Sequence, residues 1–132
     1  MSAQRLQAAR QKVLVVDDDH ASRELLAVHL ERMGFEVCTA PDGRAGLQAL
    51  GESHFDLILT DYRMPAMTGL EMAACIRRSD TTTPIILITG DSYTLDPEVI
   101  ARAGITRVLP KPLKINNLLN MYSLNAVHDN RQ

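Results

Sequence analysis

The chain has 132 residues, of which 45% are hydrophobic and 23% charged, and its net charge is -2. This length and composition fit one soluble domain with a core of ordinary size, and the lack of a basic stripe disfavours a nucleic-acid surface. No apolar run approaches the roughly 20 residues of a membrane span, so we expect no membrane insertion.

Five short apolar runs predict β-strands. They are rich in Val, Ile and Leu and do not alternate with polar residues, a pattern typical of parallel strands covered on both faces. The runs are Lys12–Val16, Phe35–Ala40, Phe55–Asp61, Pro84–Gly90 and Ile105–Pro110.

The first two gaps between these runs carry helical signals. A helical stripe of apolar residues beginning at Ala21 predicts a helix that ends near Met33–Gly34, because glycine is a natural C-terminal stop. Asp42–Gly43 starts a second helix, which we expect to end at Gly51.

The third and fourth helices have clear start signals. Thr68 and Glu71 form a capping box for a helix running towards Arg78. Asp96 and Pro97 fit the N-cap and first position of the fourth helix, which we expect Pro97 to shorten.

The fourth helix should close at Gly104, and a fifth occupies residues 113–122. Strand and helix thus alternate five times, which predicts a doubly wound α/β sheet. We divide the chain into an N-terminal lead (1–11), one domain (12–122) and a C-terminal tail (123–132).

Cys38 and Cys75 form no CxxC pair, which favours a reduced protein in the cytoplasm. The histidines lack the spacing of metal or catalytic sites, so we interpret them as surface residues. They are His20, His29, His54 and His128.

Polar side chains gather at the carboxyl ends of the predicted strands. Asp17–Asp19 follow the first strand, Asp61 closes the third, Thr89 closes the fourth and Lys111 follows the fifth. Two unit charges about 4 Å apart repel by roughly 4 kcal/mol at an effective dielectric near 20, so the acidic cluster needs compensation by solvent, a basic partner or a metal ion. Ligands bind at this edge of doubly wound sheets.

Four motifs together resemble the receiver domain of two-component response regulators. They are "VLVVDDD", "DLILTDYRMPAMTG", "PIILITG" and "VLPKP", and the resemblance covers roughly residues 12–122. It implies a flavodoxin-like (βα)5 fold with a parallel sheet in the order 2-1-3-4-5.

The resemblance also implies a chemistry. Asp61 would be the phosphoacceptor, taking a phosphoryl group from a phosphohistidine in a Mg²⁺-dependent step. Asp18 and Asp61 would bind Mg²⁺ directly, Asp17 through a water, and the backbone carbonyl of Arg63 would be a further ligand, with Mn²⁺ as an alternative ion. Asp19 falls outside this set as an exposed acid at a helix start.

By the same resemblance, Thr89 and Lys111 would bind phosphoryl oxygens and shift the face formed by the fourth helix, fifth strand and fifth helix. The bond between Lys111 and Pro112 is often cis in the family, and we expect it to be cis here. Many receivers carry an aromatic residue at the position of Val108, so an aromatic switch is missing, although Val108 equally fits simple strand packing.

Arg63 and Asp91 each stand two positions beyond a site residue. One hypothesis is that they pair across the mouth of the site and hinder the water that hydrolyses the phosphoaspartate. The alternative is two independent exposed charges, because surface ion pairs are weak.

We therefore expect a signalling module, not an enzyme, whose partner is a histidine kinase or histidine phosphotransfer domain. The output partner is unknown, and a homodimer is a further option. Two origins stay open: a stand-alone cytoplasmic regulator, or the receiver of a hybrid histidine kinase. A phosphate-independent scaffold is a minor alternative. A small-molecule phosphatase is disfavoured because Tyr62 and Arg63 follow Asp61, where such enzymes place a second acid.

Overall fold

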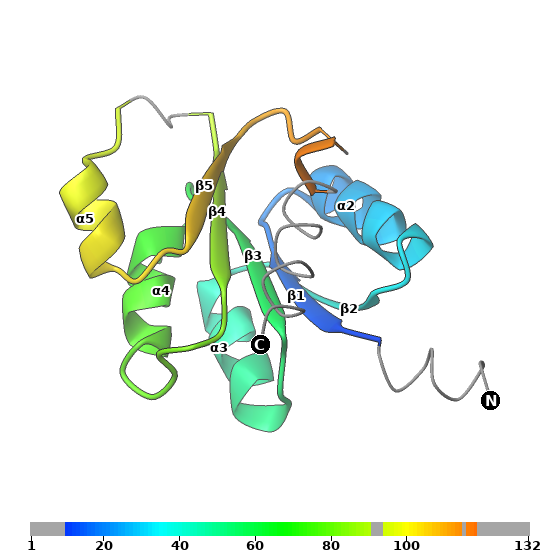
Figure 1. Cartoon of the computed structure of the whole chain (residues 1–132), viewed down its shortest axis with the longest axis horizontal. Coiled ribbons are helices and arrows are strands. Elements are labelled where there is room, and N and C mark those ends of the chain that lie inside the picture. The colour runs from blue at the N-terminus through cyan, green and yellow to red at the C-terminus, as the bar shows by residue number, and fades with distance from the viewer. Residues whose placement is uncertain (1–9, 91–93, 115, 119–132) are drawn as a thin grey trace, which may run out of the picture.

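The computed structural model describes residues 10–90, 94–114 and 116–118 of the chain. Its core is one five-stranded sheet in the order β2-β1-β3-β4-β5, and every neighbouring pair is parallel (Figure 1). This confirms the predicted doubly wound sheet and its strand order. The strands are β1 (Lys12–Val16), β2 (Glu36–Ala40), β3 (Leu57–Asp61), β4 (Ile85–Thr89) and β5 (Arg107–Pro110).

Helices connect the strands in the predicted alternation. They are α2 (His20–Arg32), α3 (Gly43–Glu52), α4 (Gly69–Ile76) and α5 (Pro97–Arg102), labelled as in Figure 1. Residues 116–118 are also helical, whereas residue 115 and residues 119–122 of the predicted fifth helix lie outside the described residues. The same holds for residues 1–9 of the predicted lead and for the whole predicted tail.

Side-chain caps determine where these helices begin. Each N-cap residue accepts a hydrogen bond from a backbone N–H of the first turn, which satisfies a donor that has no partner within the helix. The N-caps are Asp19, Asp42, Thr68 and Asp96. In α4 the predicted capping box is complete, because Glu71 also accepts the backbone N–H of Thr68 at 2.8 Å.

Two of the three predicted helix stops are confirmed. Gly34 and Gly104 adopt left-handed φ angles of 100° and 81°, which glycine takes without strain. Gly51 was wrong as a stop: α3 continues through Glu52, and Ser53 caps it by donating its N–H to the carbonyl of Ala49.

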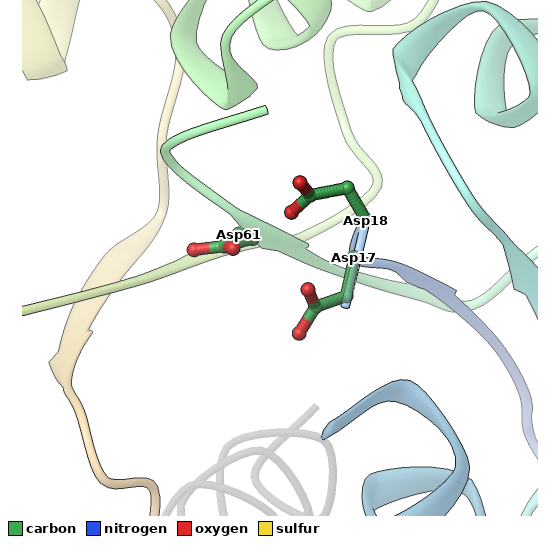
Figure 2. A group of neighbouring side chains, drawn as sticks. All are labelled: Asp17, Asp18 and Asp61. Atoms are coloured by element: carbon green, nitrogen blue, oxygen red, sulfur yellow. The ribbon is translucent and has the colours of Figure 1, made fainter. Parts of the chain in front are cut away.

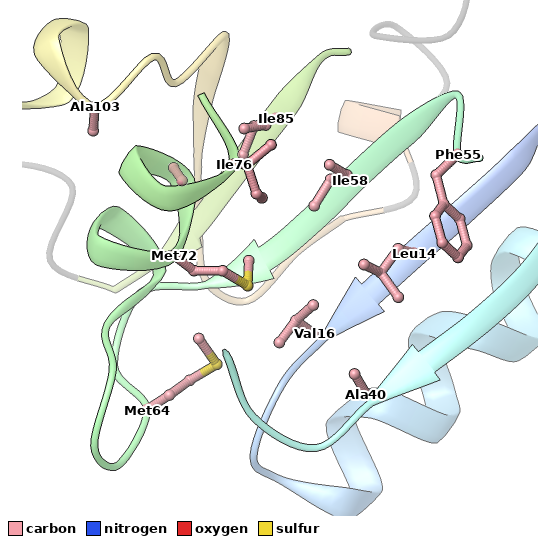
Figure 3. Close-up of a cluster of buried hydrophobic side chains, with 11 residues drawn as sticks. Leu14, Val16, Ala40, Phe55, Ile58, Met64, Met72, Ile76, Ile85 and Ala103 are labelled. Carbon is pink, nitrogen blue, oxygen red and sulfur yellow. The ribbon is translucent and has the colours of Figure 1, made fainter. Parts of the chain in front are cut away.

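Hydrophobic layers cover the two faces of the sheet. Leu14 and Val16 pack with side chains of α4, including Met72, on the face that α3 also covers (Figure 3). Val13 and Val15 point to the opposite face, where Leu30 of α2 lies in the same cluster. Alternate residues of one strand thus build two separate cores.

The prediction of strands covered on both faces holds for β1, β3 and β4 and was wrong for the two edge strands. In β3 and β4 every residue is buried, whereas all four residues of β2 before Ala40 are at least partly exposed, and β5 contains no buried residue. Edge strands have a neighbour on one side only, so the helices cover them less completely. Burial is therefore most complete in the three central strands, β1, β3 and β4.

Polar contacts close the end of the domain opposite the carboxyl ends of the strands. Arg77, just after α4, donates from Nε and Nη2 to the carbonyl of Gly104 at 2.9 and 2.8 Å. Asp80 accepts the hydroxyl of Thr83 at 2.6 Å and the backbone N–H groups of Thr82 and Thr83. The hydroxyl of Thr83 and these N–H groups lower the pKa of Asp80 to about 2.

We predict that Asp80→Asn destabilises the fold in a pH-dependent way. The pKa of Asp80 is lower in the folded state than its ordinary value of 3.8, so the charged carboxylate contributes stability above about pH 4 and loses it as the pH falls towards about 2. Because the turn is partly solvent-exposed, we expect a loss of only about 1 kcal/mol at neutral pH. Urea unfolding of the wild type and of Asp80→Asn across this pH range measures the loss of stability. A difference in unfolding free energy that does not change with pH would contradict the prediction.

Candidate functional site

Three carboxylates meet at the carboxyl edge of the sheet. Val16 of β1 pairs in register with Thr60 of β3, so the residues that follow these two along the chain, Asp17 and Asp61, lie at the same level. Together with Asp18 they place one carboxylate oxygen each within 4.8 Å of the others (Figure 2). Asp17 and Asp61 are buried and Asp18 is exposed, so the cluster opens to solvent on one side.

Asp17 is held from both its side chain and its backbone. Its Oδ1 accepts the N–H of Asp19 at 2.9 Å, and its carbonyl accepts Nη1 of Arg23 at 2.7 Å. Burial raises the pKa of the Asp17 carboxyl, and the negative charge of Asp61 raises it further. The site thus contains a carboxylate whose charge is not fully compensated by the protein.

Asp19 plays the separate part expected of it. It is exposed, and its Oδ2 accepts the N–H of Ser22 at 2.8 Å as the N-cap of α2. This hydrogen bond lowers the pKa of Asp19. Asp19 therefore starts a helix and lies outside the group of three carboxylates.

Lys111 supplies a cation to the cluster. Its Nζ lies 3.0 Å from Oδ1 of Asp61, and its backbone N–H donates to the carbonyl of Thr89 at 3.1 Å. Thr89 is buried at the end of β4, and the bond between Lys111 and Pro112 is cis, as predicted. The structure thus brings together the predicted residues at the carboxyl ends of β1, β3, β4 and β5. They are Asp17, Asp61, Thr89 and Lys111.

Gly69 is a site residue that sequence reasoning missed. A Cβ atom there would overlap the carbonyl oxygen of Asp61 and come within 2.8 Å of Leu87, while the N–H of Gly69 donates to the carbonyl of Tyr62 at 2.9 Å. Only glycine allows the start of α4 to approach the end of β3 this closely. The Thr68–Gly69 pair in the recognised motif was the available signal.

From the sequence alone, Arg23 has no predicted role and the histidines are interpreted as surface residues. Nη2 of Arg23 lies 3.1 Å from Nδ1 of His20, and because arginine has only donors, Nδ1 is the acceptor. His20 and His54 are exposed as predicted, whereas His29 is partly buried and lines a cavity. His128 lies outside the described residues.

That cavity, of about 430 Å³, opens beside the acidic cluster. Asp17 and Lys111 form its polar end, and its remaining wall comes mainly from apolar side chains of α2 and of the segment after β5. Leu25, on α2, lines it and is 60% exposed. The wall residues are Ser22, Leu25, Leu26, His29, Ile88, Pro112, Leu113 and Leu118.

Of the remaining predicted residues, the structure describes Val108 and Arg63. Val108 is partly buried in β5 and pairs in register with Leu87. The guanidinium of Arg63 lies 5.7 Å from the ring centre of Tyr62. Asp91 lies outside the described residues, so its pairing with Arg63 stays a hypothesis.

Comparison with known proteins decides the family. Residues 13–123 match the family model of the response regulator receiver domain. The chain belongs to this family. It is a receiver domain of two-component signalling, and its relatives include both response regulators and sensor kinases.

Among these relatives is the sensor histidine kinase RcsC of Escherichia coli K12, 32% identical over 114 residues that make up 86% of this chain. The chain spans 12% of the length of RcsC and about half of the length of the curated DNA-binding regulators that it matches.

Solved structures confirm the fold of the receiver domain. The chemotaxis response regulator CheY4 of Vibrio cholerae has a TM-score of 0.81 and 33% identity, covering 87% of this chain and 98% of that one. The receiver domain of the sensor histidine kinase PA1611 from Pseudomonas aeruginosa has a TM-score of 0.78 and 28% identity, covering 86% and 94%. The latter holds a magnesium ion in its active-site cleft.

Within the described part of the receiver domain, no helix combines the length and the apolar character needed to cross a bilayer.

We predict that Gly69→Ala destabilises the receiver domain by about 2–3 kcal/mol, because the new methyl group forces the start of α4 away from Asp61. Gly51→Ala is the matched control: its Cβ would meet nothing within 4 Å inside α3, so we expect up to about 1 kcal/mol of stabilisation. Urea denaturation measures both. Equal stability changes in the two variants would contradict this assignment.

Proposed function

We propose that this receiver domain accepts a phosphoryl group from a phosphohistidine onto Asp61. A carboxylate oxygen of Asp61 forms the new bond to phosphorus, the phosphorus–nitrogen bond breaks, and the leaving imidazole nitrogen keeps the electron pair. The observation that carries the proposal is the surroundings of Asp61: Lys111 lies 3.0 Å from one of its oxygens, and two further carboxylates lie within 4.8 Å.

The donor set fits a magnesium ion. Its members are oxygen ligands, partly buried and open on one side, as a small hard cation that retains waters requires. We propose Asp18 and Asp61 as direct ligands, Asp17 as a ligand through water, and the backbone carbonyl of Arg63 as a fourth group. When bound, Mg²⁺ neutralises charge on the phosphoryl oxygens and positions them.

Two other side chains would bind the phosphoryl group after transfer. Lys111 donates to one oxygen and the hydroxyl of Thr89 to another, so the group's charge of nearly -2 is compensated at two points. Because Val108 has no ring to reorient, the signal passes through the backbone of the segments that carry Thr89 and Lys111.

We further propose that the phosphoryl donor is a histidine kinase or phosphotransfer domain and that the protein acts in the cytoplasm as a signalling domain rather than an enzyme. Both origins, a stand-alone regulator and the receiver of a hybrid kinase, are compatible with the relatives of the family.

Intact mass after incubation with acetyl phosphate tests the chemistry. We expect one phosphoryl adduct on the wild type in the presence of Mg²⁺, none without the ion, and none on Asp61→Asn, which removes the nucleophile and keeps the size of the side chain.

Asp56→Asn is the matched control, since this carboxylate lies before β3 and accepts the backbone N–H of Lys12 at 2.9 Å. It should be phosphorylated like the wild type. An adduct that persists on Asp61→Asn, or that forms without a divalent ion, would contradict the proposal. A folded wild type without any adduct would favour the phosphate-independent scaffold.

The cavity beside Asp17 and Lys111 suggests where the donor protein docks. A phosphohistidine must reach bonding distance of Asp61, so its protein must cover the surface around this opening. The apolar wall and the exposed Leu25 offer a complementary contact to an apolar helix face.

We predict that Leu25→Glu slows phosphotransfer from such a protein at least about tenfold while leaving phosphorylation by acetyl phosphate unchanged, because the small donor needs no docking surface. Val99→Glu changes an equally apolar side chain, 47% exposed, on the distant α5 and serves as the control. Parallel loss in both variants, or loss with acetyl phosphate as well, would contradict the proposed docking face.

A further inference from the structure

We propose that Arg23 is a positioning residue for the metal site, holding the turn that presents Asp17 and Asp18. The inference rests on the proposed function of this site. The link joins the guanidinium to a backbone atom: Nη1 of Arg23 donates to the carbonyl oxygen of Asp17 at 2.7 Å, in a partly buried position. This oxygen belongs to the peptide group between the two acidic residues, so holding it fixes the direction in which both carboxylates leave the chain.

The turn is closed at three further points. The N–H of Asp19 donates to Oδ1 of Asp17, and the N–H of Arg23 donates to the carbonyl of Asp19 at 2.9 Å. The N–H of Ser22 donates to Oδ2 of Asp19. The first turn of α2 and the acidic segment thus form one hydrogen-bonded unit, and the Arg23 side chain is the part that reaches back to Asp17.

The guanidinium is also held at its other end. Nη2 of Arg23 lies 3.1 Å from Nδ1 of His20, while Nη1 contacts Asp17. Two acceptors, one per terminal nitrogen, fix the plane of the group. A lysine carries one nitrogen and cannot reproduce both contacts in the same geometry, which makes Arg23→Lys an informative variant.

Helix stability does not explain Arg23. It is the fourth residue of α2, where the positive end of the helix dipole disfavours a cation. A cation also repels a divalent ion bound nearby. If charge were the whole role of Arg23, its removal would strengthen Mg²⁺ binding. If Arg23 positions the ligands, its removal weakens binding, so the two roles predict opposite signs.

Isothermal titration calorimetry of the unphosphorylated full chain with Mg²⁺ distinguishes these two roles of Arg23. We expect Arg23→Ala to raise the dissociation constant of Mg²⁺ about tenfold, the lower end of the range for residues that support metal ligands. Arg23→Lys should show a smaller increase. Arg32→Ala, an exposed arginine in the last turn of the same helix, is the matched control and should bind Mg²⁺ like the wild type.

A second readout separates positioning from a general loss of structure. With saturating Mg²⁺, Arg23→Ala should recover phosphorylation by acetyl phosphate, because the ion then restores the ligand geometry that the arginine provided. Circular dichroism checks folding, and if Arg23→Ala is unfolded, the affinity of Arg23→Lys decides. Unchanged or tighter Mg²⁺ binding in the folded variants would overturn the role of Arg23 alone. A wild type that binds no Mg²⁺ would overturn both this inference and the proposed metal site.

Discussion

Repulsion among three carboxylates is the constraint on which the site depends. Asp17, Asp18 and Asp61 bring oxygen atoms within 4.8 Å of one another at the end of a buried sheet. The surrounding contacts offset this repulsion in part: Lys111 forms an ion pair with Asp61, and the N–H of Asp19 donates to Asp17. Burial raises the pKa of Asp17, and the negative charge of Asp61 raises it further. A divalent cation bound among the three carboxylates would oppose both effects.

The sheet makes this crowding unavoidable. Parallel strands all end at the same edge, and their register places the residues after β1 and at the end of β3 at one level. Every residue of β3 and β4 is buried, so these strands cannot slide without moving apolar side chains into solvent. The same hydrophobic burial that stabilises the fold holds the acidic residues together against their repulsion.

Features that depend on the type of side chain, or on the residues next to it along the chain, could be predicted from the sequence. Strand positions, helix caps and the convergence of Asp61 with Lys111 follow from apolar runs, capping residues and the parallel topology. Gly69 and Arg23 were missed because their partners are backbone carbonyls of Asp61 and Asp17, which no residue letter reports. Gly51 misled because, unlike Gly34 and Gly104, it does not adopt the left-handed conformation in which glycine commonly ends a helix, and α3 continues through Glu52.

The ion pair between Lys111 and Asp61 has a thermodynamic consequence for the switch. The ammonium group already has an anionic partner before any phosphoryl group arrives. In the proposed mechanism it gives up this partner as it takes a phosphoryl oxygen, so the switch gains only the difference between two attractions. The exchange therefore favours the switched state by less than a newly formed ion pair would. A protein that docks preferentially to one of the two states can then shift the equilibrium by its difference in affinity for them.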